Sequence, residues 1–412
     1  MNTIIRFDQR RLKYAATIND EALTEETNPD LEIEYVDIGN VDSSGLIHET
    51  KVHRFEESPS RARRVVRDGD VIVSTVRTYL QAIAAIRNPP KNMIVSTGFA
   101  VVRPRRDTLT PDFCKYALRE PAFLAEVEMR STGVSYPAVN ALELGNIRIH
   151  LPSISLQQLI ADGLDRETAR LDGLVSAKER LLAVIAEKRQ ALIAHAVTRG
   201  LDPRANLHDS GVPWLGQIPA HWQVERAKRL FRERDDRSES GEEEMLTVSH
   251  LTGVTPRSEK DVNMFEAETT EGYKICHAGD LVVNTLWAWM GAMGVSPMYG
   301  IVSPAYNIYE PNNRLYPKYV DALVRIPVFA EEATRYSKGV WSSRLRLYPE
   351  GFFEIWMPVP PIDEQRAIVA HIGSETAKLD ALRKAAERTI LLLKERRAAL
   401  IAAAVTGQIE VS

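Results

Sequence analysis

Short motifs that could carry catalysis are few in this sequence of 412 residues. The run Asn88-Pro89-Pro90-Lys91 is similar to the Asn-Pro-Pro-aromatic motif of amino-methyltransferases, but Lys91 stands where an aromatic ring would stack on a flipped base. No glycine-rich cofactor loop follows a strand upstream of this run, and the sequence has no Walker-type phosphate loop. The run therefore predicts no methyltransferase site.

Acidic residues and histidines form no catalytic constellation either. Asp112 with Glu126 and Glu128 has the acidic character of a metal-dependent nuclease, yet the lysine that completes such a site is absent. Four histidines lack the neighbours of a metal or triad site and are interpreted as structural: His48, His53, His208 and His221. We expect no catalysis by this chain alone, and no metal or cofactor in it.

Two copies of one helix-forming sequence organise the chain. Residues 167–198 and 375–406, superposed at an offset of 208 residues, agree at 18 of 32 positions. The chain is therefore a tandem duplication. Each copy belongs to a run of roughly 40 residues without an internal proline, which predicts a helix about 60 Å long.

An apolar stripe along each copy predicts that the two helices pack on each other. So long a helix cannot bury its stripe inside its own domain, and we expect an antiparallel coiled coil that holds two domains apart, with two unconnected surface helices as the alternative. The predicted seam residues are Leu171, Leu174, Leu181, Ile185, Leu192 and Ala196 in the first copy, and Leu379, Leu382, Ala386, Leu393, Leu400 and Ala404 in the second.

The segment before each helix has the pattern of a mixed α/β domain. In the first half, strands are expected at residues 35–38, 94–102 and 147–149, with a helical pattern over 113–127. Residues 69–74 are expected to be a turn that leads into a buried strand. Equivalent marks return in the same order in the second half, where Gly279-Asp280 repeats Gly69-Asp70. The expected fold class is mixed α/β (α+β) with an internal pseudo-twofold duplication. The expected boundaries are 1–153 and 201–358 for the domains, and 154–200 and 359–412 for the helices.

Length, charge and cysteine content limit the number of domains and the cellular compartment that we expect for this chain. A chain of this length exceeds a single core, and the formal net charge of -4 neither supports nor excludes nucleic acid as a partner. The two cysteines, Cys114 and Cys276, are not at equivalent places and indicate no disulfide framework or zinc site. No signal peptide and no apolar run of membrane-spanning length is found, so a reducing cytoplasm is expected.

A connector rich in proline and glycine joins the two halves. Residues 211–222 read Gly-Val-Pro-Trp-Leu-Gly-Gln-Ile-Pro-Ala-His-Trp, and both helices end in Ala-Leu-Ile-x-x-Ala-Val-Thr. Together with the doubled α/β domain, these motifs make the chain resemble the specificity subunit of type I restriction–modification systems. The resemblance covers essentially the whole sequence.

The resemblance implies a function in DNA recognition. Each α/β unit is then a target recognition domain that reads one half of a split site in double-stranded DNA, and the helices set the gap between the halves. It further implies that two methyltransferase subunits dock on the helices, that restriction subunits join outside, and that S-adenosylmethionine, ATP and Mg belong to those partners. Because the two domains differ in sequence, the recognised site should be asymmetric.

Two loops recur at equivalent places and carry the residue types that read DNA. One follows the Gly-Asp strand, and the other precedes the final strand of each domain. The candidate contacts are Ser74, Thr75, Arg77, Tyr79, Arg130, Ser131, Thr132, Ser135 and Tyr136 in the first domain, and Asn284, Thr285, Trp287, Trp289, Arg335, Ser337, Lys338, Trp341, Ser342, Arg344 and Arg346 in the second. The alternatives are solvated surface loops, core positions for Trp287 and Trp289, and, for the whole chain, a coiled-coil scaffold whose domains bind a partner other than DNA.

Overall fold

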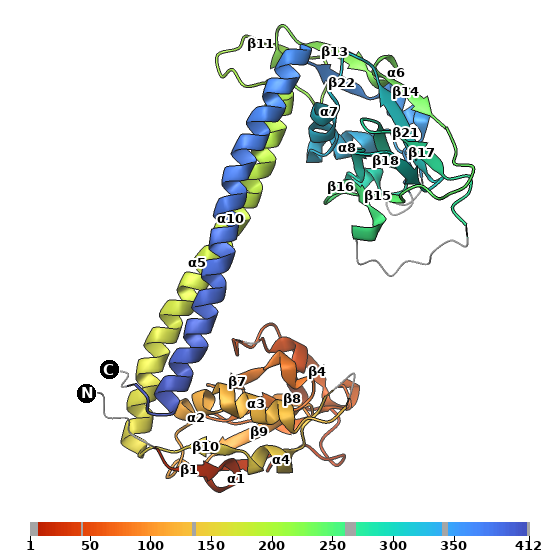
Figure 1. Cartoon of the computed structure of the whole chain (residues 1–412). Helices are drawn as coiled ribbons and strands as arrows, with labels where there is room; N and C mark the ends of the chain where they lie inside the picture. The colour runs from red at the N-terminus through yellow and green to blue at the C-terminus, as the bar shows by residue number, and fades with distance from the viewer. Residues whose placement is uncertain (1–6, 43, 134–136, 260–268, 340–344, 410–412) are drawn as a thin grey trace. The chain divides into compact units, whose positions relative to one another are not determined.

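The chain folds into two compact units. The structure, a computed structural model, describes residues 7–42, 44–133, 137–259, 269–339 and 345–409 (Figure 1). Unit 1 comprises residues 1–179 and 387–412, and unit 2 comprises residues 180–386. Each unit combines one α/β domain with a part of both long helices. The expected fold class, two mixed α/β domains joined by two long antiparallel helices, is confirmed.

The first domain is built on two four-stranded sheets. One has the order β2-β9-β6-β7, and the other, β4-β3-β8-β5, contains the parallel pair β3-β8. Strand β1 pairs with β10. The strands are β1 (Gln9–Arg11), β2 (Ala16–Ile18), β3 (Glu32–Val36), β4 (Lys51–Arg54), β5 (Ala62–Val65), β6 (Val71–Ser74), β7 (Ile83–Ala85), β8 (Met93–Ser96), β9 (Phe99–Pro104) and β10 (Arg148–His150). The helices are α1 (Leu12–Ala15), α2 (Pro111–Ala117), α3 (Pro121–Met129) and α4 (Ala141–Asn146), with 3-10 turns η1 (Ile38–Asn40), η2 (Phe55–Glu57) and η3 (Thr78–Leu80).

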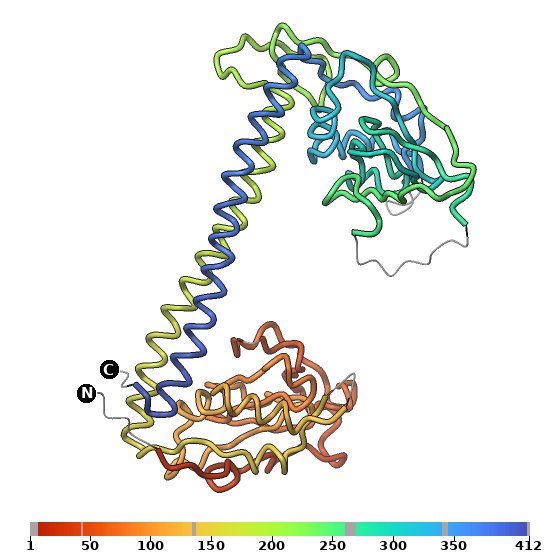
Figure 2. Tube along the Cα trace, in the orientation of Figure 1, coloured from red at the N-terminus to blue at the C-terminus, as the bar shows by residue number. Residues whose placement is uncertain are grey.

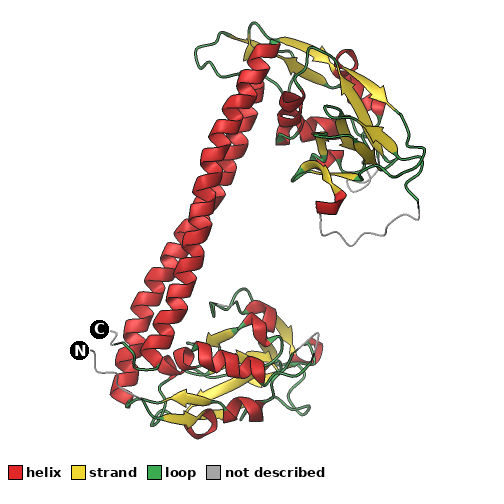
Figure 3. Cartoon of the chain, in the orientation of Figure 1, coloured by secondary structure: helices red, strands yellow, loops and turns green. Residues whose placement is uncertain are grey.

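The second domain repeats the central sheet as β14-β21-β18-β19 and the outer pair as β13-β22. Its further pairs are β11-β12, β15-β16 and β17-β20. Figure 3 shows the strands in yellow and the helices in red. The strands are β11 (Leu207–Asp209), β12 (Gln217–Pro219), β13 (Gln223–Arg226), β14 (Phe231–Arg234), β15 (Leu246–Ser249), β16 (Gly253–Pro256), β17 (Lys274–Cys276), β18 (Leu281–Asn284), β19 (Met293–Val295), β20 (Gly300–Val302), β21 (Tyr306–Pro311) and β22 (Trp356–Val359). The helices are α6 (Ala227–Leu230), α7 (Pro317–Val324), α8 (Pro327–Arg335) and α9 (Pro349–Glu354), with η4 (Arg257–Glu259) and η5 (Ala288–Met290).

Three expected elements differ from the structure by more than one residue in their limits. Residues 94–102 form two strands in different sheets, because the chain turns at Gly98, whose N–H donates to Ser96 Oγ. The helical pattern over 113–127 is two helices, since Pro121 begins α3 and the Glu120 carboxylate caps it. The strand expected at 35–38 ends at Val36, where η1 follows.

A buried aspartate after a left-handed glycine anchors the central strand of each domain. Gly69 has φ 89° and Gly279 has φ 98°, a conformation that favours glycine. Asp70 Oδ2 accepts the N–H of Arg67 at 2.7 Å, and Asp280 Oδ2 accepts that of His277 at 2.8 Å. The predicted equivalence of the two Gly-Asp turns therefore extends to their hydrogen bonds.

Helices α5 (Ile154–Arg199) and α10 (Ile362–Val405) run side by side (Figures 1 and 2). In unit 1 the domain core includes Leu164 of α5 and Ile401 of α10. In unit 2 it includes Val197 of α5 and Ile368 of α10. Each core thus joins the beginning of one helix to the end of the other, as antiparallel packing requires.

One buried glutamine at the start of each long helix ties it to its domain. Gln157 Oε1 accepts the N–H of Thr110 at 2.8 Å, and its Nε2 donates to two backbone carbonyls, of Thr108 and Pro152, at 2.9 Å each. Gln365, one repeat later, makes the same three bonds, to Tyr316, Arg314 and Pro360. Both side chains are fully buried. The repeat therefore preserves the junction of helix and domain.

The inward face of the helix pair has a strict heptad spacing. In α5 the inward residues are Leu164, Thr168, Leu171, Val175, Lys178, Leu182, Ile185, Arg189, Leu192 and Ala196, all buried or half-buried. Their equivalents in α10, each 208 residues later, are inward too, apart from the exposed Arg383. The seam prediction is wrong at Leu174, Leu181 and Leu382, which are 41–57% exposed. Lys178 and Arg189 occupy inward positions. Because the apolar pattern passes over charged residues, it predicted nearby leucines as seam residues instead.

Within the described ranges, no helix is long and apolar enough to span a membrane.

Candidate nucleic-acid interface

The two candidate loops of the first domain contact each other. Arg77 N–H donates to the carbonyl of Pro137 at 2.9 Å, and Val76 forms a β-bridge with Ala138. The hydroxyls of Thr78 and Ser131 are 3.0 Å apart. Residues from the end of β6 and from the segment after α3 therefore form one continuous surface.

The equivalent loops of the second domain also meet. Leu347 N–H donates to the carbonyl of Thr285 at 3.1 Å, and Thr334 Oγ1 donates to the carbonyl of Trp289 at 3.4 Å. Lys338 and Arg346 are paired in a β-bridge. The topology thus brings the same two segments together in both domains, and we call each such surface a loop pair: residues 75–81 with 130–133 and 137–139, and residues 285–291 with 335–339 and 345–347.

Four of the predicted DNA contacts are buried inside the domains, so the prediction is wrong for these residues. Ser74 and Thr75 are at most 9% exposed, and their hydroxyls donate to the carbonyls of Val76 and Gly98. Asn284 and Thr285 are equally buried, with Asn284 Oδ1 accepting the N–H of Leu286. These side chains shape the loops and do not reach a ligand. Their place at the carboxyl end of a buried strand accounts for the error.

The exposed candidates of the first loop pair are Arg77, Tyr79 and Thr132. Arg77 has a left-handed backbone with φ 54°, and the Tyr79 side chain is 55% exposed. Sequence reasoning missed Gln81, which is exposed and also left-handed, with φ 51°. Positive φ is unfavourable for residues other than glycine and is concentrated at functional sites. This local strain has no sequence signal.

Two other candidates in the first domain are engaged internally. The Arg130 guanidinium binds Glu126 at 2.8 Å and Glu143 at 3.0 Å, and these hydrogen bonds raise the pKa of Arg130. Ser131 Oγ donates to the carbonyl of Val127 at 2.8 Å. Both residues therefore position the loop and offer little to a ligand.

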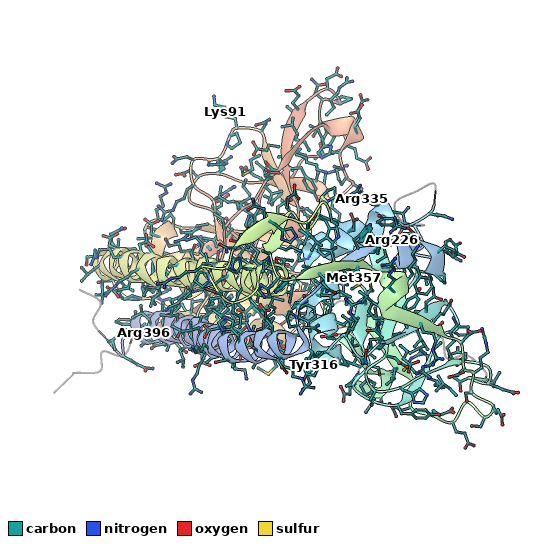
Figure 4. The ribbon with its side chains drawn as sticks, turned by 90° about the horizontal axis from the view of Figure 1, so that it is seen from above. Lys91, Arg226, Tyr316, Arg335, Met357 and Arg396 are labelled. Carbon is teal, nitrogen blue, oxygen red and sulfur yellow. The ribbon has the colours of Figure 1, made fainter. Side chains whose placement is uncertain are left out.

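The second loop pair carries aromatic and basic side chains. Trp287 is 51% exposed and stacks on the half-buried Trp289, with ring centroids 6.0 Å apart and planes at 21°. Trp289 Nε1 donates to the carbonyl of Leu286 at 3.0 Å, which holds this ring in place. Arg335, labelled in Figure 4, is exposed and pairs with Glu332 at 3.0 Å.

Lys338 and Arg346 are exposed, whereas Ser337 donates to the carbonyl of Ala333 at 2.8 Å. Leu286 and Met290 are exposed beside the tryptophans and were missed, because apolar side chains on a turn resemble core residues in sequence. Five candidates lie outside the described residues: Ser135, Tyr136, Trp341, Ser342 and Arg344.

The long helices carry exposed apolar residues at positions that the sequence repeat relates. In unit 1, Leu174 of α5 and Leu392 of α10 are exposed, and in unit 2 their equivalents, Leu382 and Val184, are exposed as well. We call these two sets the helix patches. Each set consists of exposed apolar side chains on helices whose inward faces are already paired.

No family model matches the chain. It is 19% identical to the type I restriction enzyme MjaX specificity subunit of Methanocaldococcus jannaschii over 98% of this chain and 94% of that protein. It is 17% identical to the EcoDI specificity subunit of Escherichia coli over 69% of this chain and 68% of that protein. A shorter match, 22% identical to the HindI specificity subunit of Haemophilus influenzae, spans 31% of this chain and 28% of that protein.

Solved structures agree in fold. A chain from a study of assembly and conformational transition of the type I R-M system matches with a TM-score of 0.76 and 23% identity, over 98% of each chain. The HsdS subunit of Thermoanaerobacter tengcongensis matches with a TM-score of 0.54 and 23% identity, over 98% of this chain and 97% of that one. The resemblance to type I specificity subunits is confirmed. The relatives named above are specificity subunits. Among the described residues, no group of three or more His, Cys, Asp or Glu side chains could hold a metal ion.

Proposed function

We propose that this chain is the DNA-recognition subunit of a type I restriction–modification complex. Each α/β domain reads one half of a bipartite site in double-stranded DNA. The observation that carries the proposal is the loop pair, which both domains build at the same place and fill with different exposed side chains. Equivalent position with different chemistry is what two readers of two unlike sequences require, so the site is asymmetric.

The exposed residues have the chemistry of groove contacts. Arg77, Lys338 and Arg346 can bind phosphates or base edges, and Tyr79 and Trp287 offer rings that stack on bases or sugars. The buried residues beneath them hold the loops rigidly, which reduces the entropy lost on binding.

The paired helices serve as the ruler and as the docking surface. Helix α5 has 46 residues and α10 has 44, so each is about 65–70 Å long. The two helix patches are related by the repeat, and each accepts one copy of the same partner, a methyltransferase subunit. Restriction subunits join the complex through these partners.

The chemistry of modification and cleavage belongs to the partner subunits. S-adenosylmethionine, ATP and Mg are bound there, and the partners methylate adenine or cut the DNA. This chain contributes the choice of sequence and the distance between its two halves.

Exchange of one domain tests the proposal. Residues 1–153 are replaced by the corresponding domain of a relative with another specificity, and methylated sites are mapped by sequencing after expression with the methyltransferase. One half of the methylated sequence should change while the other half and the gap stay the same. The matched exchange of residues 201–358 should change the opposite half.

A change in both halves, or in neither, would contradict the division of labour between the domains. Purified complex that binds no DNA in either form would instead favour a scaffold whose domains bind another partner.

A further inference from the structure

A polar cavity of about 420 Å³ opens in unit 1 beside the outer strand pair. It lies between the β1-β10 pair, the α3 helix and the end of α4. Its polar lining includes Gln9, Arg11, Arg130, Asn146, Arg148 and His150. This volume is within the range of small-molecule sites in proteins, about 300–1,000 Å³.

Two arginines of this lining face each other across the strand pair. Arg11 in β1 is directly opposite Arg148 in β10, and both are exposed. Within the described part of the chain, neither guanidinium forms an ion pair with a carboxylate. Like charges at opposite cross-strand positions are destabilising. The fold therefore keeps an unfavourable pair at this place.

The second domain shows how the same position is neutralised. There Arg226 of β13 is opposite Trp356 of β22, and its guanidinium carbon lies 5.0 Å from the centre of the Trp356 ring. The guanidinium also pairs with Glu354, the last residue of α9, at 2.7 Å. Arg226 and the neighbouring Met357 are labelled in Figure 4.

The first domain replaces both neutralising groups. Arg148 occupies the position of Trp356, and Asn146, the last residue of α4, occupies that of Glu354. One substitution adds a positive charge and the other removes a negative one. The two acidic groups in the lining are already engaged: Glu120 caps α3, and Glu126 binds Arg130.

The floor of the cavity offers one donor and one acceptor. Gln9 Nε2 lies 3.0 Å from His150 Nε2, and because an amide nitrogen only donates, the ring proton is assigned to Nδ1. His150 Nδ1 and Asn146 Oδ1 are buried, and among the described residues neither atom has a hydrogen-bond partner. Buried polar atoms are ordinarily satisfied, so these two atoms keep unused hydrogen-bonding capacity beneath the cavity.

We propose that this cavity binds the phosphate group of a nucleotide. Arg11 and Arg148 hold the phosphate at the rim, since two guanidinium forks about 5 Å apart at their Cβ atoms can share one tetrahedral anion. The body of the nucleotide lies against the part of the lining that Asn146 and His150 form. The nucleotide is either a free small molecule or part of a DNA strand, and both present the same phosphate chemistry.

Titration of the full-length chain with AMP and with inorganic phosphate tests the site. AMP should bind at one site per chain by isothermal titration calorimetry, and phosphate should bind more weakly. Arg148→Gln should weaken AMP binding at least about tenfold, because it removes a charge-assisted contact. Arg226→Gln in the second domain is the matched control and should leave the affinity for AMP unchanged.

The variant Asn146→Glu should change AMP binding and thermal stability in opposite directions. It restores the acidic partner that the second domain has, so it should abolish AMP binding while raising the melting temperature of the ligand-free chain by about 1–3 °C. A merely structural Asn146 would lower the melting temperature when replaced. Because this variant is expected to be more stable, loss of binding is not due to unfolding.

Competition with a DNA duplex distinguishes the two sources of phosphate. A duplex that displaces AMP identifies a DNA strand as the occupant, and AMP binding unaffected by duplex identifies a free nucleotide. If neither AMP nor phosphate binds, or if Arg148→Gln binds AMP as the unaltered chain does, the inference is wrong. The titration requires no sequence recognition, so its outcome is separable from that of the domain exchange.

Discussion

The guanidinium of Arg189 lies 3.0 Å from the carboxylate of Asp380. One repeat away, Arg397 and Asp172 form the same pair, also at 3.0 Å. All four residues differ from their partners in the repeat by 208 positions. The two ion pairs fix the same antiparallel alignment of α5 and α10, one in each compact unit, so the duplication is preserved in interhelical contacts as well as in sequence.

Reversing the charge of one residue in such an ion pair should destabilise the chain, and reversing the charge of its partner as well should restore the stability. Arg189→Asp places two carboxylates together and should lower the free energy of unfolding by about 0.5–1 kcal/mol, since the groups are 40–45% exposed and partly screened by water. Adding Asp380→Arg should restore most of the loss. Denaturant titration of the single and double variants measures both effects, and independence of the two changes would exclude a direct interaction.

The buried glutamines at the helix starts should be far more costly to replace. Gln157→Leu leaves the N–H of Thr110 and two carbonyls buried without partners, which should cost about 2–4 kcal/mol. Gln365→Leu should have the same cost in unit 2. Hydrogen exchange should show the loss of protection in the altered unit, and Gln158→Leu, at an exposed position, should be neutral.

The long helices and the doubled domains could be predicted because their signals are repeated along the chain. The duplicated helices extend over many residues, and the Gly-Asp turns recur with the same neighbours. The seam register could not, because Lys178 and Arg189 interrupt the apolar pattern at inward positions. Likewise, the recurrence of the two candidate loops could be predicted from the repeat, but their contact with each other and the burial of Ser74 and Asn284 depend on the fold around them.

Removal of the exposed tryptophan should weaken DNA binding without affecting folding. Trp287→Ala should reduce the affinity of the assembled complex about tenfold, because stacking of a ring on a base contributes about 1–3 kcal/mol. Tyr299→Ala, at another exposed aromatic residue of the same domain, is the control. Fluorescence anisotropy with a labelled duplex measures the affinity. If Trp287→Ala binds DNA as tightly as Tyr299→Ala does, Trp287 does not contact the DNA.

Charges placed on one helix patch should release one methyltransferase subunit and retain the other. Leu174→Glu with Leu392→Glu alters the patch of unit 1, and Val184→Glu with Leu382→Glu alters that of unit 2. Each double variant should lower the ratio of methyltransferase to this chain from two to one in light scattering. Leu251→Glu, at an exposed leucine away from the helices, should keep the ratio at two. Loss of both partners from one double variant would refute two independent patches.

Lengthening both helices by one heptad should lengthen the gap in the recognised sequence. The insertion points are Arg180/Leu181 and Arg388/Thr389, which lie midway between the ion-pair residues of each helix. Seven residues preserve the 3.5-residue seam and add about 10 Å, or about three base pairs at 3.4 Å each. Mapping of methylated sites should show unchanged half-sites and the longer gap.

A four-residue insertion near Ala183 in α5 alone shifts the seam and should abolish assembly or alter the gap. An active complex with the original gap after the paired insertion would show that the helices do not measure the site.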